Sequence, residues 1–203
     1  MKIPILKKSA FILVLLIFLS PKNSLSTQNE NILDLTSSYI DNLKTFKANF
    51  VQFDGNGSVT NGKLFIKRPG RMRIEYEPSA KMLIIIDGFY LIYIDLEIDE
   101  ATYTDLDSTP AKFLLDPDWS FAKNANQIEK IINKSGLIEI TLKAEDVGEL
   151  TFIFTQDPME LRQWRIKDRA NKEIIITLYD IEKDIDLDTE LFKYNKTDIF
   201  NDD

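Results

Sequence analysis

The 203-residue sequence contains neither cysteine nor histidine. The lack of cysteine excludes disulfides, thiolate nucleophiles, iron–sulfur clusters and zinc sites built from cysteine. The lack of histidine excludes a Ser–His–Asp triad, histidine metal ligands and any side chain whose unperturbed pKa lies between about 5 and 8. An enzyme built from this chain would have to rely on carboxylates, lysine, tyrosine, serine or threonine.

Glycine and positive charge are also scarce. The seven glycines all lie in or beside polar breaks between apolar segments, and 33 Asp and Glu outnumber 25 Lys and Arg, for a formal charge of -8. A chain this acidic is repelled by phosphate backbones, so nucleic acid is a poor choice of partner. Hydrophobic residues make up 44% of the chain, which is enough for the core of one globular domain.

The apolar run Ala10–Leu19 is ten residues long, whereas a membrane-spanning helix needs about 20. Lysines precede this run and polar residues follow it, a pattern typical of a secretory signal peptide. We therefore expect residues 1–26 to be cleaved, with Ser24 and Ser26 at the -3 and -1 positions, and residues 27–203 to form a single domain. Cleavage removes four lysines and no acid, which changes the formal charge to -12. No cysteine follows the run, so we expect a soluble exported chain that is not lipidated at its new N-terminus.

Hydrophobic periodicity predicts a helix followed by a sheet. Apolar residues recur three or four apart from Asn31 to Phe46, which predicts an amphipathic helix. The sequence Thr109-Pro110 predicts the start of a short helix that continues to Leu115 and stops near Pro117. Period-two segments between turn residues predict strands, which are Gly62–Lys67, Met82–Ile86, Phe89–Ile94, Leu137–Leu142, Leu150–Thr155, Leu161–Lys167 and Glu173–Tyr179. Strands joined by hairpins favour a curled antiparallel meander.

Motifs for catalysis or metal binding are weak. The run Gly55–Ser58 is not followed by a P-loop lysine, so it is interpreted as a turn. Alternating aspartates from Asp184 to Asp188 resemble the start of a calcium loop, but glycine is missing at the sixth position and Asn195 replaces the final glutamate. A glycosidase-like pair of carboxylates stays open, although no pair is marked out. We expect no enzyme activity, no cofactor and no metal site.

Two adjacent segments, Met82–Ile86 and Phe89–Ile94, are apolar on both faces, whereas a sheet over a single core is apolar on one. Core could cover both faces of this hairpin. Alternatively, one face could line a cavity for an apolar ligand. The alternation does not show which residues would face such a cavity.

The segment Gly62–Tyr76, which contains Lys67-Arg68-Pro69-Gly70, resembles the outer-membrane lipoprotein carrier family, LolA. The family resemblance extends over nearly the whole mature chain in the same order. It includes Phe50-Val51-Gln52, Ile86-Asp87-Gly88, Thr109–Leu115 and Leu191–Tyr194.

This resemblance implies a mainly β (α+β) fold, an incomplete and strongly curved antiparallel β-barrel whose N-terminal helix and short helical segment form a lid. It also implies a periplasmic chaperone that holds the acyl chains of lipoproteins in a hydrophobic cavity. Such a carrier accepts cargo from an inner-membrane lipoprotein-releasing ABC transporter and delivers it to an outer-membrane lipoprotein receptor. A module of the same fold that carries another lipid or senses envelope stress is the alternative.

The resemblance also assigns candidate site residues. The family's arginine in Lys-Arg-Pro donates hydrogen bonds to lid carbonyls from inside the barrel, and Arg68 has the matching position. Strand alternation places Leu64 and Ile66 on the same face as Arg68, and we expect Met72, Ile74 and Tyr76 to continue that surface beyond the bend. The expected lid residues are Leu35, Tyr39 and Leu43 on the first helix, and Pro110, Phe113 and Leu114 on the second.

Overall fold

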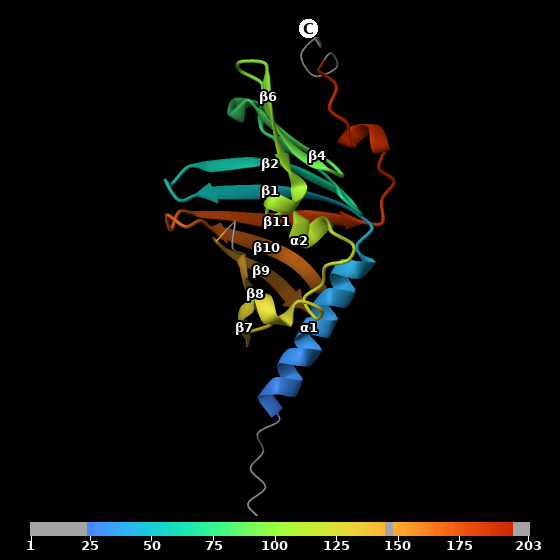
Figure 1. The fold of residues 1–203 in the computed structure, drawn as a ribbon, viewed down its shortest axis with the longest axis vertical. Coiled ribbons are helices and arrows are strands. Elements are labelled where there is room, and N and C mark those ends of the chain that lie inside the picture. The colour runs from blue at the N-terminus through green and yellow to red at the C-terminus, as the bar shows by residue number, and fades with distance from the viewer. Residues whose placement is uncertain (1–23, 145–147, 197–203) are drawn as a thin grey trace, which may run out of the picture.

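In the computed structural model, which describes residues 24–144 and 148–196, eleven strands form one antiparallel sheet (Figure 1). The predicted signal peptide lies outside the described residues except for Ser24–Ser26, which begin helix α1 (Ser24–Asn42). No helix in the described ranges combines the length and apolar character needed to cross a membrane. The strands before the short helix α2 (Lys112–Leu115) are β1 (Thr45–Asp54), β2 (Val59–Lys67), β3 (Arg71–Tyr76), β4 (Met82–Asp87), β5 (Tyr90–Asp95) and β6 (Glu100–Asp105). Those after it are β7 (Ile128–Lys134), β8 (Leu137–Ala144), β9 (Gly148–Gln156), β10 (Met159–Lys167) and β11 (Glu173–Lys183).

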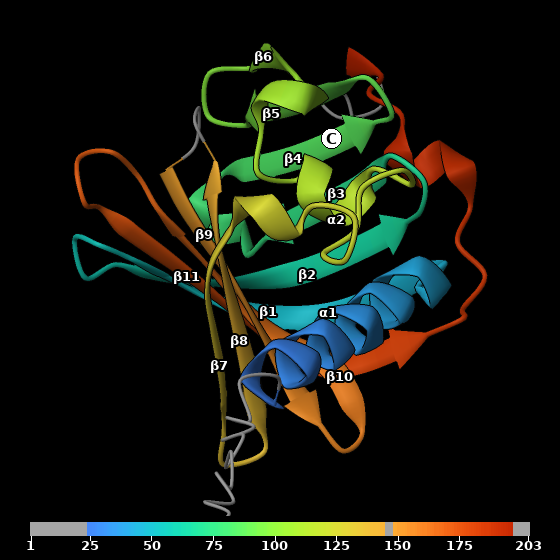
Figure 2. The same cartoon turned by 60° about the horizontal axis from the view of Figure 1, so that its bottom comes forward.

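The strand order is β6-β5-β4-β3-β2-β1-β11-β10-β9-β8-β7, so the first and last strands of the chain pair at the centre. Strands β6 and β7 form the two edges of the sheet and are not paired with each other. The sheet curls around α1 and α2, which lie on its concave side (Figure 2). The predicted class, an incomplete and strongly curved antiparallel barrel with two helical pieces, is confirmed.

The predicted end of the first helix at Phe46 is wrong. Helix α1 ends at Asn42, and Phe46 belongs to β1, where it alternates with Ala48 and Phe50 as almost fully buried residues. Phe46 lies three residues after Leu43, which imitates helical spacing, but it is also the first member of a period-two series. Pairing of β1 with both β2 and β11 selects the strand.

The predicted inward stripe of α1 is also partly wrong, because Leu35 is 49% exposed. The helix instead buries Ile32, Leu33 and Ile40 together with Thr36, which is fully buried. The Thr36 hydroxyl donates a 2.8 Å hydrogen bond to the Ile32 carbonyl oxygen within the same helix. Its polar group is thus satisfied locally, so threonine can take an inward position that hydrophobicity alone assigns to leucine.

The lid segment, defined as residues 106–127, connects edge strand β6 to edge strand β7 and includes α2. It buries six large side chains against the concave face, namely Leu106, Phe113, Leu114, Leu115, Trp119 and Phe121. Phe121 makes edge-to-face contacts with Trp119 at 5.0 Å and with Phe152 at 5.5 Å between ring centroids. Because such contacts add to the burial of apolar area, the lid segment is well packed at its β7 end.

The convex face of the β4–β5 hairpin is covered separately. Leu83, Ile85, Ile92 and Ile94 form a second buried cluster on that face. The C-terminal residues 184–194 run over it, and Tyr194 packs on the cluster. Lys67 on β2 donates a 2.6 Å hydrogen bond to the carbonyl oxygen of Leu187 and so fixes the course of this segment.

Candidate functional site

A cavity of about 200 Å³ lies on the concave face of the sheet beneath the lid segment. Of the residues predicted to form such a cavity, Met72, Ile74 and Tyr76 line it, and the predicted lid residues Pro110 and Leu114 close it from above. The remaining lining residues are Gln52, Ile84, Ile86, Leu91, Ala111, Leu150, Phe152, Trp164, Ile166, Ile174 and Ile176. The wall is therefore almost entirely aliphatic and aromatic, as an apolar ligand requires.

The two apolar faces of the β4–β5 hairpin have different environments. Ile84, Ile86 and Leu91 face the cavity, whereas Ile85 and Ile92 face the opposite, convex cluster. Both sequence alternatives therefore hold in part, because one face lines the cavity and the other is ordinary core under the C-terminal residues.

Three other predicted residues pack beside the cavity without lining it. Leu64 borders a hollow of about 10 Å³ next to the main cavity, and Ile66 is fully buried in the surrounding core. Phe113 is buried in the same core and contacts Trp119 at 5.1 Å between ring centroids. Strand alternation identified the correct face for Leu64 and Ile66 but could not show where the core ends and the cavity begins.

The predicted residues of α1 do not reach the cavity. Leu43 is buried in the core, and the half-buried Tyr39 contacts Phe154 edge-to-face at 5.9 Å. Together with the exposed Leu35, they border a separate groove beside Met159 and Lys183. Helix α1 thus supports the barrel next to the lid segment and does not close the cavity itself.

Arg68 connects the barrel to both helical pieces. Its guanidinium donates one hydrogen bond to the carbonyl oxygen of Ile40, near the end of α1, and another of 3.1 Å to that of Asp116, directly after α2. The rigid fork of donors suits arginine to hold two carbonyls at once. Burial of the half-buried guanidinium lowers the pKa of Arg68, whereas Asp41 and Asp116 act in the opposite direction. A backbone hydrogen bond of 3.1 Å from Gly70 to Leu115 lies beside this contact.

Polar groups enter the cavity wall at one place. The Tyr76 hydroxyl donates a 2.9 Å hydrogen bond to Gln52 Oε1, and Gln52 Nε2 donates a 2.8 Å hydrogen bond to Asp54 Oδ1. Burial raises the pKa of Tyr76 to about 12, with further increases from Asp54 and Tyr93, so the hydroxyl is protonated at neutral pH. Sequence reasoning missed Gln52 as a site residue, although its spacing of two from the buried Phe50 on β1 was the available signal.

A second hollow, of about 370 Å³, lies at the end of the barrel formed by the β1–β2 and β10–β11 turns. Ile166 and Ile174 line both this hollow and the cavity, so the two adjoin. The outer part is polar and is formed by Asp54, Gly55, Asn56, Asp168 and Lys172. The Gly55–Ser58 run thus serves as the β1–β2 turn, with a 2.8 Å hydrogen bond from the Gly57 amide to the Asp54 carbonyl oxygen.

Comparisons with known proteins bear on this architecture. The family model described as outer membrane lipoprotein carrier protein LolA matches residues 41–195. An outer-membrane lipoprotein carrier protein of Legionella pneumophila is 24% identical over 195 residues, which cover 91% of this chain and 93% of the relative. An uncharacterized conserved protein of Thermus thermophilus has a TM-score of 0.51 at 9% identity, covering 84% of this chain and 95% of that one. The structure of MucB also has a TM-score of 0.51 at 9% identity, covering 83% of this chain and 63% of MucB.

The two solved structures show a shared fold, whereas the family model spans most of the chain and includes Arg68, the cavity wall and the lid segment. The family resemblance seen in the sequence is therefore confirmed. The chain belongs to the LolA family of outer membrane lipoprotein carrier proteins.

Proposed function

We propose that this protein is a periplasmic carrier that shields the acyl chains of lipoproteins in the cavity beneath its lid segment. The supporting observation is an apolar cavity on the concave face, covered by a segment that Arg68 holds through backbone carbonyls. Family membership and the apolar run near the N-terminus support the same role. The protein binds its cargo without changing it chemically, and it uses no cofactor.

The cost of exposing a fatty chain to water explains why a carrier is needed. Each methylene group exposed to water costs about 0.8 kcal/mol, so a long acyl chain costs on the order of 10 kcal/mol. An apolar, water-poor cavity removes much of this cost. Release at the destination without ATP then requires a net affinity lower than burial of the acyl chain alone would give.

The size of the cavity indicates which process lowers the net affinity. At about 200 Å³, the cavity is only slightly larger than the roughly 150 Å³ engineered cavity that holds a benzene molecule. A long acyl chain can therefore be accommodated in full beneath the lid segment only when that segment moves away from the concave face. Opening breaks the hydrogen bonds of Arg68 and exposes Leu114, which lowers the net affinity and favours release.

Arg68 is the latch in this proposal. In the closed state its guanidinium holds Ile40 and Asp116 together, so one side chain controls both α1 and the lid segment. A closed lid segment also covers the apolar wall of the empty cavity, which keeps ligand-free molecules from associating with one another through it. The carrier receives cargo from an inner-membrane lipoprotein-releasing ABC transporter and delivers it to an outer-membrane lipoprotein receptor, acting as a monomer.

Purification from the cell envelope tests this function. We expect the protein isolated from cells with active lipoprotein export to carry lipoprotein, detected by mass spectrometry of the intact complex. Depletion of the protein should cause lipoproteins to accumulate at the inner membrane. Protein that is free of lipoprotein under these conditions, with normal lipoprotein localisation after depletion, would contradict the proposal.

A further inference from the structure

We infer that a bound acyl ligand has one orientation: its ester or amide group lies beside Gln52 and Tyr76, its polar part leaves between the β1–β2 and β10–β11 turns, and its tail points toward the lid segment. This inference rests on the proposed function, because it assigns an orientation to the ligand of the same cavity. It follows from three features of the cavity: its open end, its closed end and the position of its polar groups.

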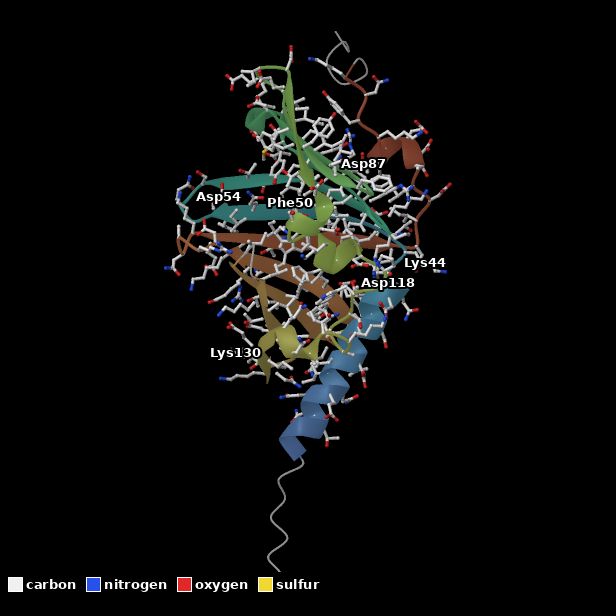
Figure 3. The ribbon with its side chains drawn as sticks, viewed as in Figure 1. Lys44, Phe50, Asp54, Asp87, Asp118 and Lys130 are labelled. Atoms are coloured by element: carbon white, nitrogen blue, oxygen red, sulfur yellow. The ribbon has the colours of Figure 1, made fainter. Side chains whose placement is uncertain are left out.

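The open end is fixed by strand register. Asp54, the last residue of β1, pairs with Ile174 near the start of β11, so the two turns lie side by side. The hollow between them adjoins the cavity through Ile166 and Ile174. Figure 3 shows Asp54 at this end of the sheet. A ligand can therefore extend from the cavity into solvent here without displacing a strand.

The opposite end of the barrel is closed by direct contacts. The Arg68 guanidinium donates hydrogen bonds to the carbonyl oxygens of Ile40 and Asp116. The Gly70 amide donates another to the carbonyl oxygen of Leu115. Asp118 and Lys44, which follow α2 and α1 respectively, lie at this end in Figure 3, away from Asp54. These contacts describe the ligand-free protein, but the lid residues that line the cavity, Pro110, Ala111 and Leu114, are apolar whether the lid segment is closed or lifted. A fatty tail directed this way meets apolar side chains, and a polar group would find no partner among them.

The polar groups of the wall lie close to the open end. Gln52 uses one N–H to bond Asp54, at 2.8 Å, and its Oε1 to accept from Tyr76, at 2.9 Å. An amide nitrogen has a second N–H, and a tyrosine oxygen can accept as well as donate. The pair can thus donate to an acyl carbonyl and accept from an amide N–H. Because a polar group left without a partner in an apolar cavity is costly, the ester or amide is expected to lie at this place.

The rim beyond these groups is suited to the peptide that follows the lipid. Asp54, Asn56, Asp168 and Lys172 surround the hollow, and the exposed Lys172 carries the positive charge of this group. Exposed charges contribute little affinity but keep the surface hydrated. The lipid can therefore be enclosed while the attached peptide remains in water.

The first experiment measures orientation by fluorescence quenching. Because the chain has no cysteine, Ser58→Cys in the β1–β2 turn and Asp118→Cys in the lid segment each give one labelling site, and both residues are exposed. Each labelled protein is titrated with a fatty-acid methylamide that carries a nitroxide either next to the amide or at the end of the chain. We expect the amide-end nitroxide to quench the label at position 58 more strongly, and the tail-end nitroxide to quench the label at position 118 more strongly.

The outcomes separate this inference from the proposed function. The reverse quenching pattern, or equal quenching of both labels by both probes, would overturn the orientation while leaving the carrier function intact. If calorimetry detects no binding of either probe, the cavity does not accept acyl chains, and both the inference and the proposed function fail.

The second experiment tests the polar contact. We expect Gln52→Met to weaken binding of the methylamide probe about fivefold, the typical contribution of one hydrogen bond, and to leave binding of the matching hydrocarbon unchanged. The control is Gln163→Met, because Gln163 precedes the cavity-lining Trp164 on β10 and points to the other face of the sheet. Equal loss for both probes, or no loss for the methylamide, would overturn the role of Gln52; thermal unfolding checks that both variants are folded.

Discussion

Replacing Arg68 with leucine is expected to leave the lid segment open in the ligand-free protein. The substitution removes two hydrogen bonds from a charged donor, one to Ile40 near the end of α1 and one to Asp116 after α2. A hydrogen bond of this kind contributes about 1.5–3 kcal/mol. Because Arg68 is only half-buried, we take the lower limit for each bond, which gives a loss of about 3 kcal/mol in lid closure. This corresponds to a roughly hundredfold increase in the open population.

The assay is binding of an environment-sensitive apolar dye to the ligand-free protein, because the open form exposes the cavity wall. Hydrogen exchange of the Gly70 amide, which bonds the Leu115 carbonyl oxygen at 3.1 Å, provides a local second measurement and should accelerate. We expect both signals to rise in Arg68→Leu.

The matched control is Arg71→Leu. Arg71 lies in β3 next to the cavity-lining Met72 and therefore points to the opposite face of the same hairpin. This variant should behave like the unmodified protein in both assays. Equal dye binding and equal exchange in Arg68→Leu and Arg71→Leu would refute the assignment of Arg68 as the latch.

Three further predictions concern the cavity and the sheet. Ala111→Trp should place an indole ring in the cavity of about 200 Å³ and abolish binding of an acyl probe, measured by calorimetry, with no loss of thermal stability. The free energy of unfolding, measured by denaturant titration at each pH, should decrease above pH 10, because burial raises the pKa of Tyr76 to about 12 and the hydroxyl then ionises more readily in the unfolded chain. This decrease with pH should be smaller in Tyr76→Phe. Gly62→Ala should lower the melting temperature much more than Gly136→Ala, because a Cβ at position 62 would collide with the Glu75 carbonyl oxygen and lie 2.7 Å from the Phe50 ring, whereas one at position 136 would meet no atom within 4 Å and would add only the backbone strain of a φ of +78°.

Each of these predictions has a contradicting result. Retained acyl binding in Ala111→Trp would show that ligands use another site, and Ala122→Trp, at an exposed position of the lid segment, controls for the added ring. An identical pH slope in Tyr76→Phe would mean that the hydroxyl is equally accessible in both states. Equal melting temperatures for the two glycine variants would mean that the methyl group at position 62 costs no more than the backbone strain of alanine at position 136.

Much of the sheet could be predicted from sequence because its strands alternate between two different environments. Strands β8 to β11 and the β4–β5 hairpin all show such alternation and were predicted close to their observed positions. Strand β6 was missed because nearly all of Glu100–Asp105 is exposed, so its side chains carry no periodic signal. Strand β1 was missed because Phe46 continues the helical spacing of α1 by coincidence.

The candidate site was predictable to the extent that it depends on one strand face. Met72, Ile74 and Tyr76 line the cavity because alternation continues through β3 after the turn at Gly70. Residues contributed by distant strands, such as Phe152 and Trp164, carry no local mark that separates a cavity wall from a core. Leu35 was assigned to the wrong face because a buried threonine can satisfy its own hydroxyl inside a helix.

The position of the lid segment between the two edge strands has a mechanical consequence. Strands β6 and β7 are joined to each other through residues 106–127 and not through a hydrogen-bonded ladder. The two rims of the barrel can therefore move apart as the segment lifts, while every pairing from β6 through the central β1–β11 contact to β7 stays intact. The interior can therefore widen for bulky cargo by separation of its two edge strands, without breaking the hydrogen bonds of the sheet.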